Sequence, residues 1–331
     1  MKYRKLGKSG LKISEVSLGA WLTYGNTIEE EQTISCIHEA LEQKINFIDV
    51  ADIYAKGKAE KTVGNALREE NFPRKDLVIS SKVFWPMSEN PNDAGLSKKH
   101  IMDSIHGSLQ RFGPNIEYLD IYYCHRFDYN TPLEETISAM GNLIDDGLIR
   151  YWGTSVWSAV QIERAVAISK ELGIIPPSVE QPRYNMFDRY IELDILPTVF
   201  YHGIGVTVWS PLAQGLLTGK YQEGIPKGSR ADNENTAHFL KGSLTEENVN
   251  KVAQLMEIAK EIEITVSQLA LAWNLRRKEL SSVITGATKP THVQENVEAS
   301  DVKLSKNIIE KIELILDNKP KIHPVYQPSI V

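Results

Sequence analysis

The stretch from residue 77 to residue 125 contains LVISSKV (77–83), SKKHIMDSIHGSLQRF (97–112) and YLDIYYCH (118–125), in that order. The two outer runs are short, apolar and rich in β-branched or aromatic residues, which is typical of strands buried on both faces of a parallel sheet. The middle run repeats its apolar residues with helical period, and Ser97 stands where a helix N-cap is expected. The stretch therefore predicts a strand, a helix and a second strand parallel to the first.

The same alternation continues on both sides of this stretch. The further runs with the character of buried strands are VSLGAW (16–21), NFIDVA (46–51), IRYWGTSV (149–156), SVEQPRY (178–184), GVTVWSPL (205–212) and SSVITGA (281–287). Helical period recurs in EEEQTISCIHEALEQ (29–43), PLEETISAMGNLIDD (132–146) and SAVQIERAVAISKEL (158–172). Eight strand–helix units without a linker predict a (β/α)8 TIM barrel, one domain over residues 1–331. The alternative is a doubly wound sheet, which normally has a glycine-rich turn after its first strand, and Gly19-Ala20-Trp21 does not match GxGxxG.

Three segments decorate this barrel. Residues 1–15 contain a Lys8-Ser9-Gly10 turn between short β-like pieces and predict a hairpin that caps the barrel floor. A long insertion at 214–247 follows strand seven, and we expect it to cover a ligand because loops on that side of a barrel surround the active face. In residues 304–331 the sequence predicts a C-terminal helix (305–318). A terminal segment with spaced prolines follows it, and we expect this segment to be held only loosely.

Composition excludes several classes of partner. The chain has 331 residues, 42% of them hydrophobic, and a formal net charge of -6, so there is no overall attraction to nucleic acid or anionic lipid.

The two cysteines, Cys36 and Cys124, predict no disulfide framework and fit a reducing cytoplasm. The basic start lacks the apolar run of a signal peptide, and no apolar stretch is long enough to insert into a membrane. The histidines outside the strand ends lack metal-binding spacing, so we expect no metal site.

Four residues with complementary chemistry fall at or just beyond the ends of successive predicted strands: Asp49, Tyr54, Lys82 and His125. In a barrel these ends meet at one mouth. Taken singly, each has an ordinary explanation as a helix cap, ion-pair partner, packing residue or core histidine. Taken together they predict a proton-transfer site that protonates a carbonyl oxygen while a cofactor supplies hydride to the carbon. A cation beside the tyrosine would make it a better acid, and we expect Lys82 to do this while Asp49 holds the ammonium and His125 orients the carbonyl.

At these residues the chain resembles the aldo-keto reductases. FIDVADIY (47–54), SSKVFW (80–85) and YLDIYYCH (118–125) match the family's motifs in order and spacing, and the resemblance covers nearly the whole chain. Within the family the chain is similar to the voltage-gated potassium channel β subunits and their bacterial relatives. The segments that carry this closer likeness are AKGKAEKTVGNALRE (55–69), GLSKKHI (95–101), NTPLEETISAM (130–140), YWGTSVWS (151–158) and WSPLAQGLLTGKY (209–221).

The resemblance implies a TIM barrel that binds NADPH in an extended pose, with Tyr54 as general acid. Ser155 and Gln181 would bind the nicotinamide carboxamide, and Trp209 would stack on the nicotinamide ring. Thr288, with Lys289 and His292 nearby, would bind the 2′-phosphate and favour NADP(H) over NAD(H). The cofactor-binding residues implied in this way are Trp21, Thr23, Asp49, Ser155, Gln181, Trp209, Ser210, Pro211, Leu212, Ala213, Gln214, Gly215, Lys220, Arg230, Gly286, Thr288, His292, Glu295 and Asn296.

Those residues divide by the part of the cofactor that each would contact. Residues 210–215, with Lys220 and Arg230, would wrap the pyrophosphate with backbone N–H groups and positive charge. Glu295 and Asn296 would face the adenine. The substrate pocket would be lined by Trp21, Tyr54, Trp85, His125, Arg126 and the 214–247 loop.

Three positions depart from the family pattern. Channel β subunits have asparagine in place of His125, so the full set of four here favours turnover. Many members have Trp where this chain has Arg126, which changes one wall of the pocket. Val156 occupies a position at which other members carry a polar cofactor contact.

The resulting hypothesis is NADPH-dependent reduction of aldehydes or activated ketones, including substrates with apolar or aryl bodies and small carbonyls like methylglyoxal. Another hypothesis is a nucleotide-sensing binding partner with slow turnover, as the likeness to channel subunits suggests. A third is a dehydrogenase that works mainly in the oxidative direction. The same likeness implies a homo-oligomeric ring, a tetramer or an octamer.

Overall fold

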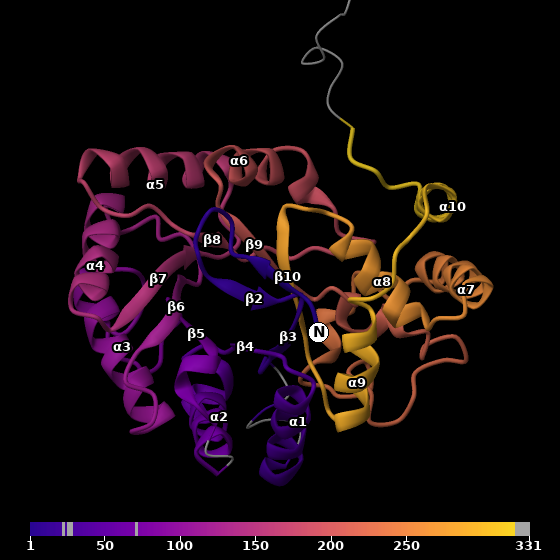
Figure 1. Cartoon of the computed structure of the whole chain (residues 1–331), viewed down its shortest axis with the longest axis horizontal. Helices are drawn as coiled ribbons and strands as arrows, with labels where there is room; N and C mark the ends of the chain where they lie inside the picture. The colour runs from indigo at the N-terminus through magenta and orange to yellow at the C-terminus, as the bar shows by residue number, and fades with distance from the viewer. Residues whose placement is uncertain (22–23, 25–28, 70–71, 322–331) are drawn as a thin grey trace, which may run out of the picture.

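In the computed structural model, which describes residues 1–21, 24, 29–69 and 72–321, eight parallel strands close into a barrel. The order around the barrel is β10-β3-β4-β5-β6-β7-β8-β9, and the helices surround the strands (Figure 1). The strands are β3 Val16–Gly19, β4 Phe47–Asp49, β5 Val78–Val83, β6 Leu119–Cys124, β7 Ile149–Thr154, β8 Val179–Glu180, β9 Gly205–Trp209 and β10 Leu280–Thr285. Seven of the eight lie within runs predicted from the sequence, and β10 begins one residue before its predicted run at 281–287. The TIM barrel is therefore confirmed and the doubly wound sheet is wrong.

Most helices cover the barrel because each has one apolar face to bury, whereas the helix at 266–275 is buried almost all round. Ser97 caps its helix as predicted, since its hydroxyl accepts from the backbone N–H of His100. The α-helices are α1 Glu30–Glu42, α2 Lys58–Glu69, α3 Lys98–Phe112, α4 Leu133–Asp145, α5 Ala159–Glu171, α6 Ile195–His202, α7 Glu246–Glu261, α8 Val266–Leu275, α9 Pro290–Glu298 and α10 Lys306–Leu316. Short 3₁₀ segments occur at η1 Tyr54–Gly57, η2 Arg74–Asp76, η3 Tyr190–Glu192, η4 Ala213–Thr218 and η5 Ala237–Phe239.

The predicted N-terminal hairpin is present, with β1 (Tyr3–Lys5) antiparallel to β2 (Lys12–Ser14). Figure 1 shows it lying across the barrel strands. Leu6 and Ile13 pack into an apolar cluster with barrel residues such as Phe47 and Tyr123, so the hairpin closes one end of the barrel. Because the four catalytic candidates lie at the other ends of the strands, the opposite end is left as the mouth.

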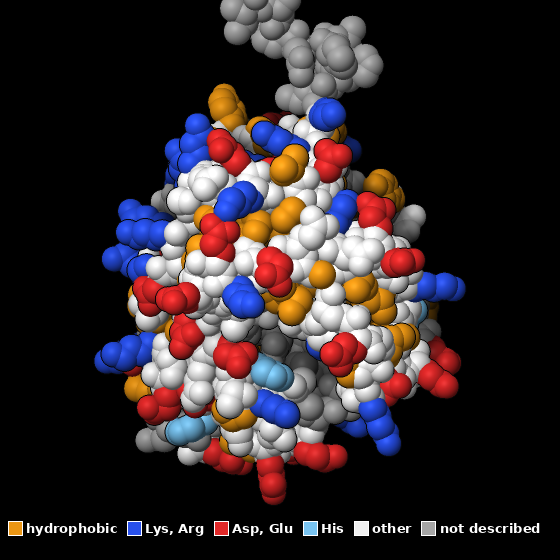
Figure 2. All heavy atoms as spheres, turned by 90° about the vertical axis from the view of Figure 1, so that its right-hand side faces the viewer, with side chains coloured by type: hydrophobic (Ala, Val, Ile, Leu, Met, Phe, Trp, Pro, Cys, Tyr) orange, Lys and Arg blue, Asp and Glu red, His pale blue; other side chains and the backbone are white. Residues whose placement is uncertain are grey.

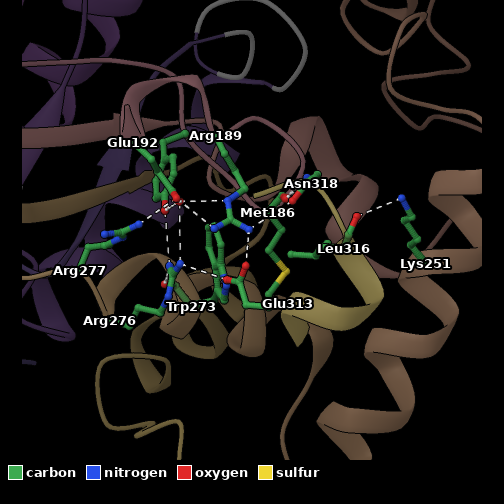
Figure 3. Close-up of polar contacts among 11 residues, drawn as sticks. Met186, Arg189, Glu192, Lys251, Trp273, Arg276, Arg277, Glu313, Leu316 and Asn318 are labelled. Carbon is green, nitrogen blue, oxygen red and sulfur yellow. Dashed lines mark hydrogen bonds and ion pairs between the residues drawn. The ribbon is translucent and has the colours of Figure 1, made fainter. Parts of the chain in front are cut away.

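The C-terminal helix α10 is held by ion pairs, which Figure 3 shows. Arg189 lies between Glu313 of α10 and Glu192 of η3, with N–O distances of 2.6 and 3.0 Å. Beyond the helix, the side-chain amide of Asn318 donates to the backbone oxygen of Met186 at 2.8 Å. The helix lies within the predicted range 305–318. These contacts fix the chain to the barrel as far as Asn318. The proline-spaced end at 322–331 lies outside the described residues.

The face formed by the last helices has mixed charge. Figure 2 shows acidic and basic side chains interspersed over it. Among the helices that the structure describes, none combines the length and the apolar character needed to cross a membrane.

Candidate active site

Strand periodicity brings Asp49 and Lys82 to the same place. Side chains alternate along a strand, so Ser80 and Lys82 of β5 point into the barrel together. The register pairs Asp49 with Ser80, and Lys82 with Tyr123 of β6. Because Tyr123 lies in the interior cluster, its partner Lys82 also faces the interior. The structure thus brings together two of the predicted residues at the mouth end of adjacent strands.

The Lys82 ammonium is surrounded by three oxygen atoms. It lies 2.6 Å from Asp49 Oδ2, 2.7 Å from the backbone oxygen of Val50 and 3.3 Å from the hydroxyl of Tyr54. Ser80 Oγ also donates to Asp49 Oδ1, at 2.7 Å. An ammonium has three N–H donors, and these contacts direct one to each neighbour. The phenol, the ammonium and the carboxylate therefore form one continuous chain of hydrogen bonds.

Burial controls how these groups titrate. It lowers the pKa of Lys82, while the adjacent Asp49 opposes that change. Burial also raises the pKa of Tyr54 well above its usual value, and Asp49 raises it further. The expected lowering of the Tyr54 pKa by Lys82 is therefore not found. The physical reason is that Asp49 largely cancels the charge of the ammonium, which leaves the desolvation of a phenolate as the dominant effect.

His125 completes the set predicted from the sequence. Its ring is perpendicular to that of Tyr54, with centroids 5.9 Å apart. Burial, together with the charges of Lys82 and Arg126, lowers the pKa of His125 well below its usual value. The imidazole is therefore neutral at pH 7. Its Nδ1 is buried and has no hydrogen-bond partner within the described residues.

The loop that carries Tyr54 has an unusual backbone. In η1, Ala55 and Lys56 have φ values of 49° and 52°, and Gly57 has 85°. Left-handed conformations are unfavourable for residues with a Cβ, so surrounding contacts must hold the loop. One such contact is Asp52, a buried residue that accepts from Ser104 Oγ at 3.0 Å.

Asp52 is a group that the sequence reasoning missed. Burial and the neighbouring carboxylate of Glu60 raise the pKa of Asp52 to about 8. Glu60 itself pairs with Arg111 at 2.6 Å. No local sequence signal shows that the Asp52 side chain is buried. Ser80 was also missed, although the alternation of side chains along SSKV (80–83) could have placed it on the same face as Lys82, beside Asp49.

Ser155 and Gln181, predicted to bind the carboxamide, lie next to this site and are buried. Ser155 Oγ donates to the backbone oxygen of Gln181 at 2.9 Å. The Gln181 amide donates to Asp49 Oδ1, also at 2.9 Å. Gln181 therefore connects Ser155 to Asp49. The neighbouring Val156 has a φ of 58°, a conformation that is strained for a β-branched residue.

Aromatic residues form another wall of the mouth. The rings of Trp21 and Trp209 meet edge to face with centroids 5.8 Å apart. Phe239, from the 214–247 insertion, packs against Trp21 at 4.9 Å. The insertion therefore contacts the aromatic residues of the mouth. That it covers a ligand stays a prediction. Thr23, also predicted to contact the cofactor, lies outside the described residues.

The turn after β9 brings residues 210–215 into a tight arrangement. Ser210, Ala213 and Gln214 have φ values of 53°, 47° and 59°, and Gly215 has 97°. The Gln214 amide donates to Ser210 Oγ and its oxygen accepts from Arg230. The two other members of the predicted turn, Pro211 and Leu212, offer backbone oxygens that accept from Asn274 and Gly215.

Lys220 and Arg230 place positive charge beside this turn. Burial lowers the pKa of both, and Arg230 lowers that of Lys220 further. Neither has a carboxylate ion-pair partner among the described residues. These two residues and the turn form a cationic cradle. A Cβ built on Gly215 would lie 3.0 Å from the Lys220 ammonium, so a side chain there would have to displace the ammonium by a few tenths of an ångström. Two adjacent cations without a carboxylate partner suit a phosphate-bearing ligand.

A second group of predicted residues lies at the start of α9. Thr288 Oγ1 is 3.4 Å from His292 Nδ1. Burial lowers the pKa of His292, Glu295 opposes this, and Lys289 and Lys220 lower it again. Lys220 therefore belongs to the same electrostatic neighbourhood as α9. Gly286 is exposed in the preceding loop, and Asn296 is buried on the helix.

The fold and the site together define a class of protein: a TIM barrel with a phenol, ammonium, carboxylate and imidazole at its mouth and a cationic cradle beside them. Comparison with known proteins agrees. Residues 15–317 match the model of the Aldo/keto reductase family, and the chain belongs to that family. The family supports an oxidoreductase that acts on small carbonyl compounds and generally binds a nicotinamide cofactor. The donors and cradle described above fit such a cofactor.

Curated relatives match nearly the full length. The chain is 46% identical over 325 residues, 97% of this chain and 98% of the relative, to a "Probable voltage-gated potassium channel subunit beta" of Arabidopsis thaliana. It is 44% identical over 325 residues, with the same coverage, to a protein of that description from Oryza sativa subsp. japonica. It is 43% identical over 327 residues, 96% of this chain and 94% of the relative, to a "Putative voltage-gated potassium channel subunit beta" of Schizosaccharomyces pombe. The likeness to channel β subunits is thereby confirmed.

Proposed function

We propose that this protein reduces aldehydes or ketones to alcohols with NADPH and that Tyr54 is the proton donor. The observation that carries the proposal is the position of the Lys82 ammonium, 2.6 Å from Asp49 Oδ2 and 3.3 Å from the Tyr54 hydroxyl, at the buried base of the mouth. Bound NADPH would supply the hydride that reduces the carbonyl carbon.

Tyr54 meets the requirements of a general acid. Its raised pKa keeps the phenol protonated at neutral pH, so the proton to be transferred is present in the resting protein. When the proton leaves, the new negative charge on the phenolate lies 3.3 Å from the Lys82 ammonium. That ammonium stabilises the product of the transfer, and Asp49 keeps it in position. The neutral imidazole of His125 would donate to or orient the carbonyl oxygen.

The cofactor would extend from the base of the mouth to α9. Ser155, Gln181 and Trp209 would hold the nicotinamide, and Trp21 would border it. Residues 210–215 with Lys220 and Arg230 would bind the pyrophosphate, and Gly286, Thr288 and His292 the 2′-phosphate. Glu295 and Asn296 would contact the adenine. Support for this order comes from the positive charges, since His292 interacts with Lys220 and Lys220 with Arg230.

The whole barrel would act as one catalytic unit with its hairpin, insertion and C-terminal helix. Cys36 and Cys124 are free and buried, which fits a reducing compartment such as the cytoplasm. A ring-shaped tetramer or octamer follows from the resemblance to channel β subunits.

The identity of 43–46% to proteins named as channel β subunits favours a second candidate function, a nucleotide-sensing binding partner with slow turnover. His125 argues for the enzyme, because it completes the set of four residues whose chemistry suits proton transfer. Pull-down from membranes, combined with a measured turnover number, separates the two functions. The same assay run with alcohols and NADP⁺ tests the oxidative direction.

The test is a steady-state assay of NADPH consumption with a panel of carbonyl compounds. Tyr54→Phe should lower kcat by at least about 100-fold, since general acid catalysis contributes about 10²–10⁴-fold. NADP⁺ binding, followed by fluorescence, should persist in the variant. Tyr201→Phe is the matched control, because Tyr201 is exposed on α6 and far from the mouth. Activity of Tyr54→Phe within tenfold of the parent would rule out Tyr54 as the acid.

A further inference from the structure

Arg126 follows His125 at the mouth end of β6, beside the proposed reaction site. One of its N–H groups donates to the backbone oxygen of His125 at 2.5 Å. Its guanidinium carbon lies 5.8 Å from the centre of the Trp85 ring. Trp85 in turn stands 6.4 Å from the His125 ring and is 39% exposed. A guanidinium has five N–H donors, so this contact leaves most of them available.

The charge of Arg126 lacks a carboxylate partner. No carboxylate oxygen among the described residues lies within 4.0 Å of it. Other partly buried arginines in this chain are paired: Arg74 with Asp120 at 2.7 Å, and Arg111 with Glu60 at 2.6 Å. Partly buried cations are normally paired because desolvation is unfavourable. Arg126 and Arg230 are exceptions, and both stand at the mouth of the site.

Glu180 is a nearby carboxylate, but its oxygens are engaged elsewhere. They accept from Thr154 Oγ1 at 2.5 Å and from the backbone N–H of Trp157 at 3.2 Å. Burial raises the pKa of Glu180 to about 7, and Arg126 offsets only part of that rise. A carboxyl group that is half protonated near neutral pH is a weak counter-ion.

The positive charge of Arg126 acts electrostatically on the proton-transfer residues. It lowers the pKa of His125 and of Lys82, and it opposes the rise in the pKa of Tyr54. The carbonyl oxygen of a substrate would be held by the same residues. A negatively charged group a few bonds from that carbonyl would therefore meet the guanidinium.

The phosphates of a bound cofactor do not account for this charge. The cationic cradle of Lys220 and Arg230 follows β9, and Thr288 follows β10. In the barrel order, β6 is four strands from β10 in either direction, so the two lie on opposite sides of the mouth. Arg126 thus belongs to the wall that faces the substrate.

We propose that Arg126 binds an anionic group of the substrate, so that the preferred carbonyl compounds carry a carboxylate and rest against Trp85. This inference depends on the proposed reductase function and specifies its substrate class. A carboxylate would form charge-assisted hydrogen bonds with the guanidinium, and these can be bidentate. An uncharged carbonyl compound of the same size would leave the guanidinium without a partner and would be the poorer substrate.

The test compares 4-carboxybenzaldehyde with its methyl ester, methyl 4-formylbenzoate, at saturating NADPH. The parent should favour the carboxylate at least tenfold in kcat/KM. Arg126→Met should reduce the ratio of the two kcat/KM values by about 30-fold, the size expected of a hydrogen bond to a charged group. Arg126→Lys keeps the positive charge but loses the planar guanidinium that can form two parallel hydrogen bonds, so it should give an intermediate ratio. Arg150→Met is the control, because Arg150 is exposed on β7 and should leave the ratio as in the parent.

A second measurement covers the case in which neither aldehyde turns over. Binding of 4-methylbenzoate in the presence of NADP⁺ should be about tenfold weaker in Arg126→Met than in the parent, with circular dichroism to confirm folding. A parent without preference for the carboxylate, or a variant with an unchanged ratio and unchanged benzoate binding, overturns the inference. The proposed function survives that result if the ester is still reduced by the parent and this activity is lost in Tyr54→Phe.

Discussion

The Lys82 ammonium and the Asp49 carboxylate form an ion pair at 2.6 Å in which both side chains are almost fully buried. Few ion pairs in this chain are so well shielded from water. A buried pair contributes little net stability when intact, but removing one partner leaves a buried charge without compensation. Here the pair also fixes the ammonium beside Tyr54, so its disruption should affect both folding and catalysis.

We therefore expect Lys82→Met to lower the free energy of unfolding by about 3 kcal/mol, because it leaves the Asp49 carboxylate buried without its cation. The double variant Asp49→Asn/Lys82→Met should be less destabilised than the sum of the two single variants. Urea unfolding of all four proteins measures this coupling. Strictly additive losses would show that the two side chains do not stabilise each other.

The raised pKa of Asp52 predicts a pH-dependent stability. With a pKa of about 8 in the folded protein and roughly 3.9 when unfolded, the folded state binds more protons across this window. Its stability should fall as pH rises from 5 to 8, and Asp52→Asn should lose roughly 3.5 kcal/mol less over that range. Asp146→Asn, at the exposed end of α4, should behave like the parent. Equal pH slopes for Asp52→Asn and the parent would contradict the assignment.

The left-handed conformation of Val156 predicts a stabilising substitution. A β-branched residue with a φ of 58° is strained, and asparagine tolerates this conformation better. Val156→Asn should raise the free energy of unfolding by about 1 kcal/mol. Val160→Asn, on the exposed face of α5, should change it by less than about 0.5 kcal/mol. Thermal unfolding of both variants decides this, and a loss of stability in Val156→Asn counts against strain.

The cationic cradle predicts which lysines distinguish the cofactors. Lys220→Met should weaken binding of both NAD⁺ and NADP⁺ by about tenfold, because the proposed contact is with the pyrophosphate. Lys289→Met should weaken only NADP⁺, whose 2′-phosphate would lie at the start of α9. Lys227→Met, an exposed position in the same insertion as Lys220, is the control. Titration calorimetry at low and high salt measures all three, and equal effects of Lys289→Met on both nucleotides would remove it from the 2′-phosphate site.

The architecture could be predicted because its signals are local. LVISSKV, SKKHIMDSIHGSLQRF and YLDIYYCH each carry a period that fixes strand or helix, and their order fixes the barrel. The same reasoning placed Asp49 and Lys82 at the mouth, where they are paired. It overestimated the length of some strands, such as 178–184, of which only Val179–Glu180 is β8, because the runs continue into the loops that form the mouth.

The electrostatic properties of the site could not be predicted in the same way. The direction of the Tyr54 pKa shift depends on the balance between burial, Asp49 and Lys82, and that balance requires coordinates. The same holds for Asp52, whose sequence neighbours give no indication that it is buried against Glu60 and Ser104.

The sequence by itself determined the strand–helix order, the family resemblance and the four residues with complementary chemistry, since periodicity and residue type are properties of neighbouring positions. The tertiary structure alone decided that Gln181 bonds to Asp49, that Val156 is strained and that the Arg126 charge lacks a carboxylate partner among the described residues. These features depend on distances and burial between segments far apart in the chain. Desolvation and charge compensation are set by that packing, and no local pattern encodes them.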